Sequence, residues 1–240
     1  MKRISLVAIC FAFWCSSRAQ EQTSADMERP FKAITFDLLS PFYPKRLLSS
    51  SENSPHLTRW RLGYRHQLDQ RWAIGADFGY GNKSLAVFKE REDYRLYEFR
   101  PELLYLLLPK RKTRVYFSFQ PFYIFHTETL RNKSVFTEGL GRVSFDQADY
   151  QRIKYGFTFN YGFLFPLFPS TRLSVYTGGG LKRRENHYSS FVNLAPFVNL
   201  APSPYHEDHF PPYYDSYVPL TEFEFSFGVK AYFFLEPKNP

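Results

Sequence analysis

Cysteine and long apolar stretches are scarce in this sequence, and each scarcity excludes a class of protein. Only two cysteines occur in 240 residues, Cys10 and Cys15. Both precede residue 20, so the chain beyond that point has no thiols for a disulfide framework. The same part of the chain has no run of roughly 18 apolar residues, the length needed for a transmembrane helix. A membrane protein of this composition must therefore cross the bilayer with the strands of a closed barrel. Besides the helix, that is the structure in which every backbone group is hydrogen-bonded within the lipid.

The beginning of the chain has the three parts of a secretory signal peptide. Two basic residues, Lys2 and Arg3, precede a short apolar stretch and a small-x-small cleavage site that ends at Ala19. We therefore expect residues 1–19 to be a signal peptide and residues 20–240 to form a single domain.

An alternative for the same segment is acylation of Cys15, as in a lipoprotein. The bulky Trp14 disfavours it, because a small residue is needed before the cysteine. Removal of the signal peptide takes away three basic residues, Lys2, Arg3 and Arg18, and lowers the formal net charge from +8 to +5. That modest excess suits anionic lipid headgroups, and export argues against nucleic acid as a partner.

Aromatic residues are abundant and are interleaved with polar ones. They make up 20% of the chain, with 27 Phe and 18 Tyr, yet the mean hydropathy is −0.40. The segment 221–235 shows the pattern most clearly, because every second position from Phe223 to Leu235 is apolar. A period of two predicts a strand with one apolar face. The segment exceeds the roughly 9 to 11 residues that a tilted strand needs to cross a bilayer.

The same alternation recurs along the chain and predicts a barrel. The connections between the segments alternate long and short, as expected when loops lie on one side of a membrane and tight turns on the other. The sequence thus predicts an all-β fold, a closed antiparallel up-and-down transmembrane β-barrel of about eight strands, with both mature termini periplasmic. The expected strands are 32–39, 57–68, 71–80, 94–108, 113–128, 150–165, 171–183 and 221–235.

The polar faces of these strands carry glycines and charges of both signs. An eight-stranded barrel has an interior only wide enough for side chains, so we predict an interior filled by ion pairs rather than an open pore. The expected members are Arg59, Arg61, Asp77, Glu98, Arg100, Glu102, Lys154, Glu224 and Lys230. These pairs would offset the cost of burying one another's charge.

A soluble barrel such as a lipocalin would place the aromatic faces inward instead. An interior of this size cannot hold so many rings, and the rings cluster at strand ends as in the aromatic girdles of outer-membrane barrels. The expected girdle residues are Trp60, Tyr80, Tyr97, Tyr123 and Tyr155 toward the long loops, and Trp72 and Tyr105 toward the short turns.

Two prolines interrupt the predicted ladder between the fourth and fifth strands. Folding this hairpin about its short turn places Pro101 nearly opposite Pro121. Neither residue has a backbone N–H to donate. We therefore expect a bulge or a local widening there.

Three segments of the predicted strands stand out, Ala33–Pro41, Leu62–Arg65 and Phe99–Leu106. Together they resemble a family of small outer-membrane barrels of uncharacterised function, similar in plan to porin-like and OmpA-type barrels. The resemblance implies outer-membrane lipid and the barrel-assembly machinery as partners, and no catalytic residue or cofactor. The chain departs from the usual pattern by ending in 236–240, EPKNP, instead of an aromatic residue.

The predicted loop 184–220 contains two candidate binding features. A tandem repeat, FVNLAP, begins at Phe191 and again at Phe197, and is either an apolar contact patch or a recent duplication in a tolerant loop. The segment His206–His209 could recruit a metal, but it lacks a recognised zinc spacing and is better interpreted as solvated loop.

One histidine, His126, is predicted to face the interior near Glu128, with Ser134 and Glu138 further along the sequence. Lipid-processing barrel enzymes combine such groups, but spacing alone is weak support. The sequence therefore favours a monomeric, non-enzymatic barrel that presents its loops to an unidentified extracellular ligand. A narrow solute channel and a lipid-modifying enzyme are the alternatives.

Overall fold

The computed structural model describes residues 31–41, 58–85, 93–109, 111–137, 141–196 and 219–235. The predicted signal peptide, the second copy of the repeat with Phe197, and the segment His206–His209 lie outside these described residues.

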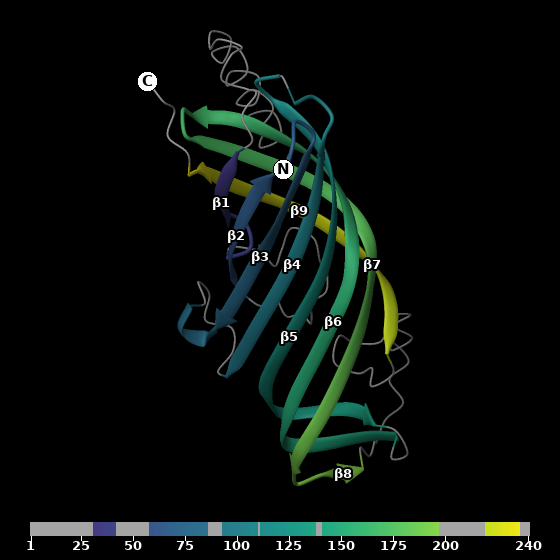
Figure 1. The fold of residues 1–240 in the computed structure, drawn as a ribbon. Coiled ribbons are helices and arrows are strands. Elements are labelled where there is room, and N and C mark those ends of the chain that lie inside the picture. Colours follow the sequence, from purple (N-terminus) through teal and green to yellow (C-terminus); the bar gives the residue numbers. More distant parts are fainter. Residues whose placement is uncertain are drawn as a thin grey trace, which may run out of the picture.

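The described chain is one antiparallel sheet in which eight strands form a ring (Figure 1). Strand β1 pairs with both β2 and β9, and each later pairing continues round the ring through β5–β6 to β7–β9. The predicted all-β antiparallel fold with about eight strands is confirmed. No helix among the described residues has the length and apolarity to span a membrane. The ring strands are β1 (Lys32–Asp37), β2 (Trp60–Gln67), β3 (Trp72–Asn82), β4 (Tyr94–Leu106), β5 (Arg114–Thr137), β6 (Gly141–Phe168), β7 (Thr171–Val192) and β9 (Leu220–Phe234).

Two short elements stand outside the ring. A 3-10 helix, η2 (Lys83–Leu85), follows β3, and β8 (Ala195–Pro196) pairs with Val143 and Ser144 of β6.

Short turns gather at one end of the ring. The turn between β2 and β3 is held by Asp69, whose Oδ1 accepts hydrogen bonds from the backbone N–H groups of Trp72 (2.7 Å) and Arg71 (2.6 Å). These two bonds hold the pKa of the Asp69 carboxyl below its usual value. The Leu235 N–H donates to the Lys32 carbonyl at 2.9 Å, so the first and last ring strands meet at this same end.

Strands β5, β6 and β7 continue well past the others at the opposite, long-loop end. Residues 129–137, 141–148 and 185–192 of these strands are named the extension. The prediction of a long loop up to Ala148 is therefore wrong, as is the prediction that the seventh strand ends at Arg183. The extension is ordered by its own apolar cluster, which consists of Leu130, Val135, Val143, Phe145, Ala148 and Tyr150.

The extension bends where its backbone leaves the usual strand conformation. Asn132 in β5 has a φ of 52° and Ser190 in β7 a φ of 55°. Between them, the β6–β7 register shifts by one residue at Gln147 and Asp149. Positive φ and an extra residue both turn a strand locally, so three neighbouring strands change direction at one level (Figure 1).

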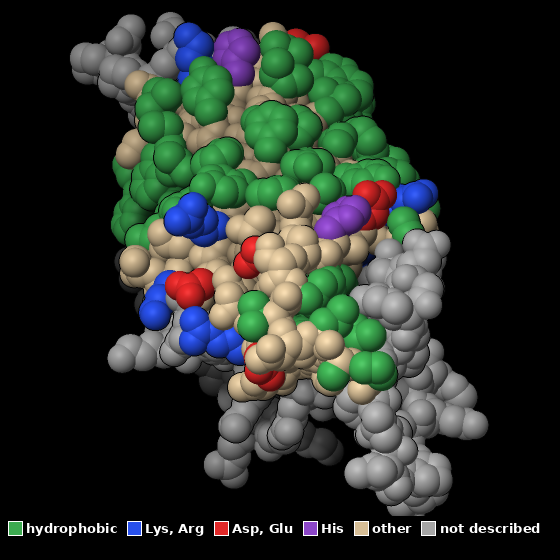
Figure 2. Space-filling model, turned by 90° about the horizontal axis from the view of Figure 1, so that it is seen from below, with side chains coloured by type: hydrophobic (Ala, Val, Ile, Leu, Met, Phe, Trp, Pro, Cys, Tyr) green, Lys and Arg blue, Asp and Glu red, His purple; other side chains and the backbone are tan. Residues whose placement is uncertain are grey.

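The two faces of the sheet differ sharply in composition. Large apolar side chains point outward on all eight ring strands and are solvent-exposed, with Phe225 81% and Phe159 61% accessible. Figure 2 shows them gathered into a broad area, beyond which polar and charged groups take over. The inward face buries charges instead, with Arg65 0% and Lys230 2% accessible. The alternation of the sequence thus places aromatic groups outside and charged groups inside.

The ladder between β4 and β5 opens at the two prolines. Along β4, residues Tyr94 to Phe99 pair with β5, and pairing resumes at Leu103. The register between the two strands is the same on both sides of this gap. The predicted interruption of the ladder is therefore confirmed, and it occurs without an inserted residue in either strand. Pro101 and Pro121 face each other at the centre of the gap. The Leu107 N–H donates to the Val115 carbonyl at 2.8 Å, so odd-numbered residues of both strands point their N–H groups into this ladder.

A candidate interior site made of ion pairs

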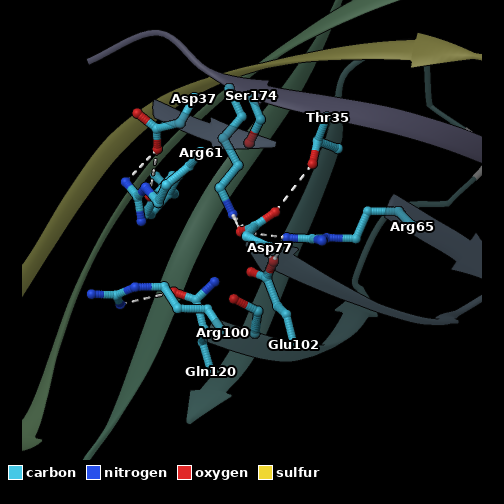
Figure 3. A network of polar contacts seen from close by, with 12 residues as sticks. Thr35, Asp37, Arg61, Arg65, Asp77, Arg100, Glu102, Gln120 and Ser174 are labelled. Carbon is cyan, nitrogen blue, oxygen red and sulfur yellow. Dashed lines mark hydrogen bonds and ion pairs between the residues drawn. The ribbon is translucent and has the colours of Figure 1, made fainter. Parts of the chain in front are cut away.

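The first cluster of the interior is centred on Asp77 and Glu102 (Figure 3). Lys230 Nζ lies 2.7 Å from Asp77 Oδ2 and 3.3 Å from Glu102 Oε2. Arg65 Nη2 lies 2.9 Å from Asp77 Oδ2 and also contacts Glu102. Thr35 donates its hydroxyl to Asp77 Oδ1 at 3.1 Å. Two carboxylates thus share two cations, and the five residues come from five different strands.

The second cluster is centred on Glu98, toward the long-loop end. Its carboxylate forms ion pairs with Arg59 and Arg100, and Arg61 Nη1 lies 4.0 Å from Glu98 Oε1. Arg61 also pairs with Asp37. One carboxylate is therefore surrounded by three guanidinium groups, one of which also pairs with a second carboxylate on the neighbouring strand β1.

Neutral groups complete the second cluster. Arg100 Nη1 donates to Gln120 Oε1 at 3.4 Å, and its guanidinium carbon lies 4.6 Å from the centre of the Phe122 ring. Tyr176 donates its hydroxyl to Asp37 Oδ2 at 3.5 Å. Polar and aromatic partners thus share the solvation of charges that water would otherwise provide.

The buried members of the two clusters balance in charge. Within these clusters the buried acids are Asp37, Asp77, Glu98 and Glu102, and the buried bases are Arg61, Arg65, Arg100 and Lys230. Four negative charges therefore face four positive ones, and Arg59 joins them with a partly accessible side chain. Burial of ions costs several kcal/mol each unless they are paired with good geometry. These eight groups are named the central network.

A third, more accessible group of ion pairs lies between β7 and β9. Lys182 Nζ lies 2.8 Å from Glu224 Oε2 and 3.5 Å from Glu222 Oε2. Arg184 Nη2 lies 3.2 Å from Glu222 Oε1. Lys154 of β6 is the register partner of Arg184, on the same inward face.

Glycines create the space that the central network occupies. A Cβ at Gly63 would overlap Asp77 Oδ1 and lie 2.5 Å from Thr35 Oγ1. A Cβ at Gly75 would overlap both the Tyr64 carbonyl and the Arg65 side chain. These positions cannot carry a side chain without displacing the ion pairs.

The structure brings seven of the nine predicted interior residues into contact with charged partners from the same set. They are Arg59, Arg61, Asp77, Glu98, Arg100, Glu102 and Lys230. Glu224 pairs instead with Lys182, and Lys154 lies beside that pair by register. Three further charged residues of the interior, Asp37, Arg65 and Lys182, were not in the predicted set. All three lie on the polar faces of their strands, so the alternation itself is the signal that could have identified them.

The other candidate residues lie toward the long-loop end. Phe191 belongs to β7 and packs against Phe145 with ring centres 5.4 Å apart, so its placement in a loop is wrong. The register of β7 with β6 and the apolar cluster of the extension hold it in the strand.

His126 is fully buried between the rings of Tyr94 and Tyr150, and its Nε2 lies 4.0 Å from Glu128 Oε2. Ser134 lies beyond the bend at Asn132, and Glu138 lies outside the described residues.

A polar cavity of about 610 Å³ opens above this histidine at the long-loop end. Its lining includes Asn82, Arg95, Glu128, Asp149 and Gln151. In the part of the chain that the structure describes, no three His, Cys, Asp or Glu side chains are grouped to hold a metal ion. The cavity suits a polar ligand that hydrogen-bonds to amide, carboxylate and guanidinium groups.

No family model, curated protein or solved structure matches this chain. The resemblance to small outer-membrane barrels is therefore supported only by the residue pattern and by the antiparallel fold.

Proposed function

We propose that the ring is a closed transmembrane β-barrel of an outer membrane, and that it serves as a non-enzymatic structural or surface-interaction module. The observation that carries the proposal is the outward display of large apolar side chains from every ring strand, together with burial of charge inside. Water would penalise such an exterior, whereas the hydrocarbon of a bilayer would not. Exposed apolar patches on soluble monomers rarely exceed a few hundred Å².

Two levels of aromatic residues support a spanning orientation. Toward the long loops, Tyr80 and Tyr97 have ring centres 5.3 Å apart, and Trp60 is the register partner of Tyr80. Toward the short turns, Trp72 and Tyr105 have ring centres 4.9 Å apart. Trp72 and Tyr80 are eight positions apart along β3, which corresponds to roughly 26 Å of strand, or roughly 20 Å of height at a tilt of about 40°. The apolar band of outer-membrane barrels is of similar size, about 25 Å tall.

The balanced central network supports a plugged interior rather than a conducting one. Its side chains come from β1, β2, β3, β4 and β9 and meet in the middle of the ring. An ion that entered would have to displace these pairs. A narrow channel for small solutes is therefore the less favoured candidate.

The long-loop end is the surface proposed for interaction with an extracellular ligand. It presents the extension and the polar cavity beside Glu128. Assembly machinery would insert the barrel as a monomer, with the short turns on the periplasmic side. A lipid-modifying activity has little support, because His126 is enclosed by two tyrosine rings.

Spin labels on adjacent residues of β9 test the proposal. The variants Phe225→Cys and Ser226→Cys are made in a chain with Cys10 and Cys15 replaced by serine, and are labelled with a nitroxide in lipid vesicles. Phe225 points outward, so its label should collide often with dissolved oxygen, which concentrates in bilayers, and rarely with a water-soluble nickel chelate. The label at Ser226 should collide less with oxygen. A protein that remains monomeric in buffer without detergent, or a nickel-accessible label at Phe225, would refute the proposal.

Conductance measurements distinguish the module from the channel. Wild-type protein in planar bilayers should give no discrete current steps. The comparison is a triple variant with Asp77→Asn, Glu102→Gln and Lys230→Met. It removes these three charges from the first cluster. Steady wild-type currents would favour the channel.

A further inference from the structure

Two arginines at the short-turn end of the ring have no carboxylate partner among the described residues, unlike the bases of the central network. Arg114 begins β5, and Arg172 is the second residue of β7. Their register partners in β6 are Leu164 and Pro166. Because neighbouring strands lie about 4.8 Å apart, the two backbones are separated by roughly 10 to 12 Å. Two long side chains can meet across that distance.

Stacking on a pair of phenylalanine rings brings the guanidinium groups together. The Arg114 guanidinium carbon lies 5.6 Å from the centre of the Phe31 ring, and that of Arg172 lies 5.5 Å from the centre of the Phe234 ring. These two rings contact each other edge to face, with centres 5.1 Å apart. Each ring attracts one cation to its face, and the contact between the rings places the two cations on neighbouring rings.

Both guanidinium groups keep buried donors that are not used. Arg114 is only 4% accessible, and it donates a 3.4 Å hydrogen bond from Nη1 to Gln67 Oε1. Its Nε and Arg172 Nη1 are buried without a hydrogen-bond partner in the part of the chain that the structure describes, as is the ammonium of Lys112, two residues before Arg114 in the sequence. Buried donors without partners are costly, and buried like charges are more so.

From this geometry we propose that Arg114 and Arg172, with Lys112, form a binding site for an oxyanion, a phosphate or carboxylate group, at the short-turn mouth of the ring. A guanidinium group presents parallel N–H donors that match two oxygens of such an anion. The anion would supply both the missing acceptors and the missing negative charge. The site goes beyond the proposed function, since it does not depend on whether the ring spans a membrane.

Thermal unfolding at constant ionic strength tests the site, with inorganic phosphate exchanged for chloride. A ligand that binds only the folded protein raises the unfolding midpoint in a saturable way. Wild-type protein should show such a rise with phosphate. The double variant Arg114→Gln with Arg172→Gln should lose it, with apparent affinity at least tenfold weaker. This variant removes two buried like charges, so we expect it to fold at least as stably as wild type without phosphate.

A matched control separates the site from general charge effects. Arg71 and Arg111 lie at the same end and are both exposed. The double variant Arg71→Gln with Arg111→Gln therefore removes the same charge and should keep the phosphate response. Glu236 follows the described residues directly, so Glu236→Gln is titrated in parallel to remove a competing carboxylate.

Two results would overturn the proposal. One is the absence of a saturable phosphate response in both wild type and Glu236→Gln. The other is an equal response in the two arginine double variants. The source of the anion is found in a further arm, with protein in nanodiscs of phosphatidylcholine alone or with phosphatidylglycerol. If free anions are the ligand, phosphate binding is the same in both lipids, whereas an anionic lipid headgroup would compete and weaken it in the second.

Discussion

Lys230 and Asp77 are 153 positions apart in the sequence, yet Lys230 Nζ lies 2.7 Å from Asp77 Oδ2 in the middle of the ring. The two residues belong to β9 and β3, which are separated by β1 and β2 in the sheet. Their contact therefore crosses the interior instead of following the backbone ladder. It links the last strand of the chain to the third one.

Removal of the Lys230 ammonium should destabilise the protein strongly. In Lys230→Met, Asp77 and Glu102 would share only Arg65, which leaves buried negative charge partly uncompensated. We expect a loss of about 3 to 5 kcal/mol in the free energy of unfolding, measured by urea denaturation in lipid vesicles. The control is Lys182→Met, at the more accessible pair with Glu224, where about 1 kcal/mol or less is expected. Equal losses would contradict a special role for the central network.

A methyl group at Gly63 should disrupt the first cluster. In Gly63→Ala the new Cβ would collide with Asp77 and Thr35, so we expect about 2 kcal/mol or more of destabilisation. Gly179→Ala is the comparison, because its Cβ would meet only the outward ring of Phe223, which can turn away. Urea denaturation and the temperature at which the folded gel band disappears measure both. An unchanged Gly63→Ala protein would show that the glycine is not needed for the ion pairs.

Restoring N–H groups at the proline gap should stabilise the ring. By the register, Pro101 and Pro121 occupy a position where each strand would donate to the other. The double variant Pro101→Val with Pro121→Val should regain two ladder bonds, worth about 1 to 3 kcal/mol together. Each single variant should gain about half. Pro166→Val, at an existing register shift near the end of β6, should gain nothing, and a decrease in stability of the double variant would contradict this account.

The extension should unfold separately from the ring. Phe145 and Phe191 pack together there, and Val135 and Val143 are buried beside them. Phe145→Ala removes most of this contact, so proteases should cut within residues 129–148 faster than in wild type. The heat-dependent gel mobility of the ring should stay unchanged. Phe159→Ala, on the exposed outer face, is the control for proteolysis, and a loss of ring stability in Phe145→Ala would contradict the separation.

Strand positions and faces could be predicted wherever alternation is strict. From Phe223 to Phe233 the sequence assigns each side chain to the face on which the structure places it. The same signal fails in residues 129–148, where Leu130, Val135 and Val143 follow no single period because the strands bend at Asn132. There the tertiary cluster, and not the local pattern, determines the strands.

The interior could be predicted in composition but not in its pairings. Polar faces identify Asp77 and Lys230 as inward residues, whereas their contact depends on ring curvature and strand order. The gap in the ladder at the two prolines could be predicted, because both residues lie in one hairpin whose register follows from its turn. The placement of Arg114 and Arg172 beside two phenylalanines depends on three separate strands and on the first described residue. Sequence spacing therefore does not predict it.

The seam between β1 and β9 has a consequence for the order of assembly. It contains only five register partners, from Ala33 with Phe234 to Asp37 with Lys230. The strand that completes this seam also carries the ammonium that neutralises Asp77 and Glu102. A nascent chain that stops before β9 would thus leave two carboxylates to share Arg65 alone, on a sheet with two free edges. Arrival of the final strand removes both defects in one event, which makes a truncated intermediate easy for quality-control proteases to distinguish from the finished molecule.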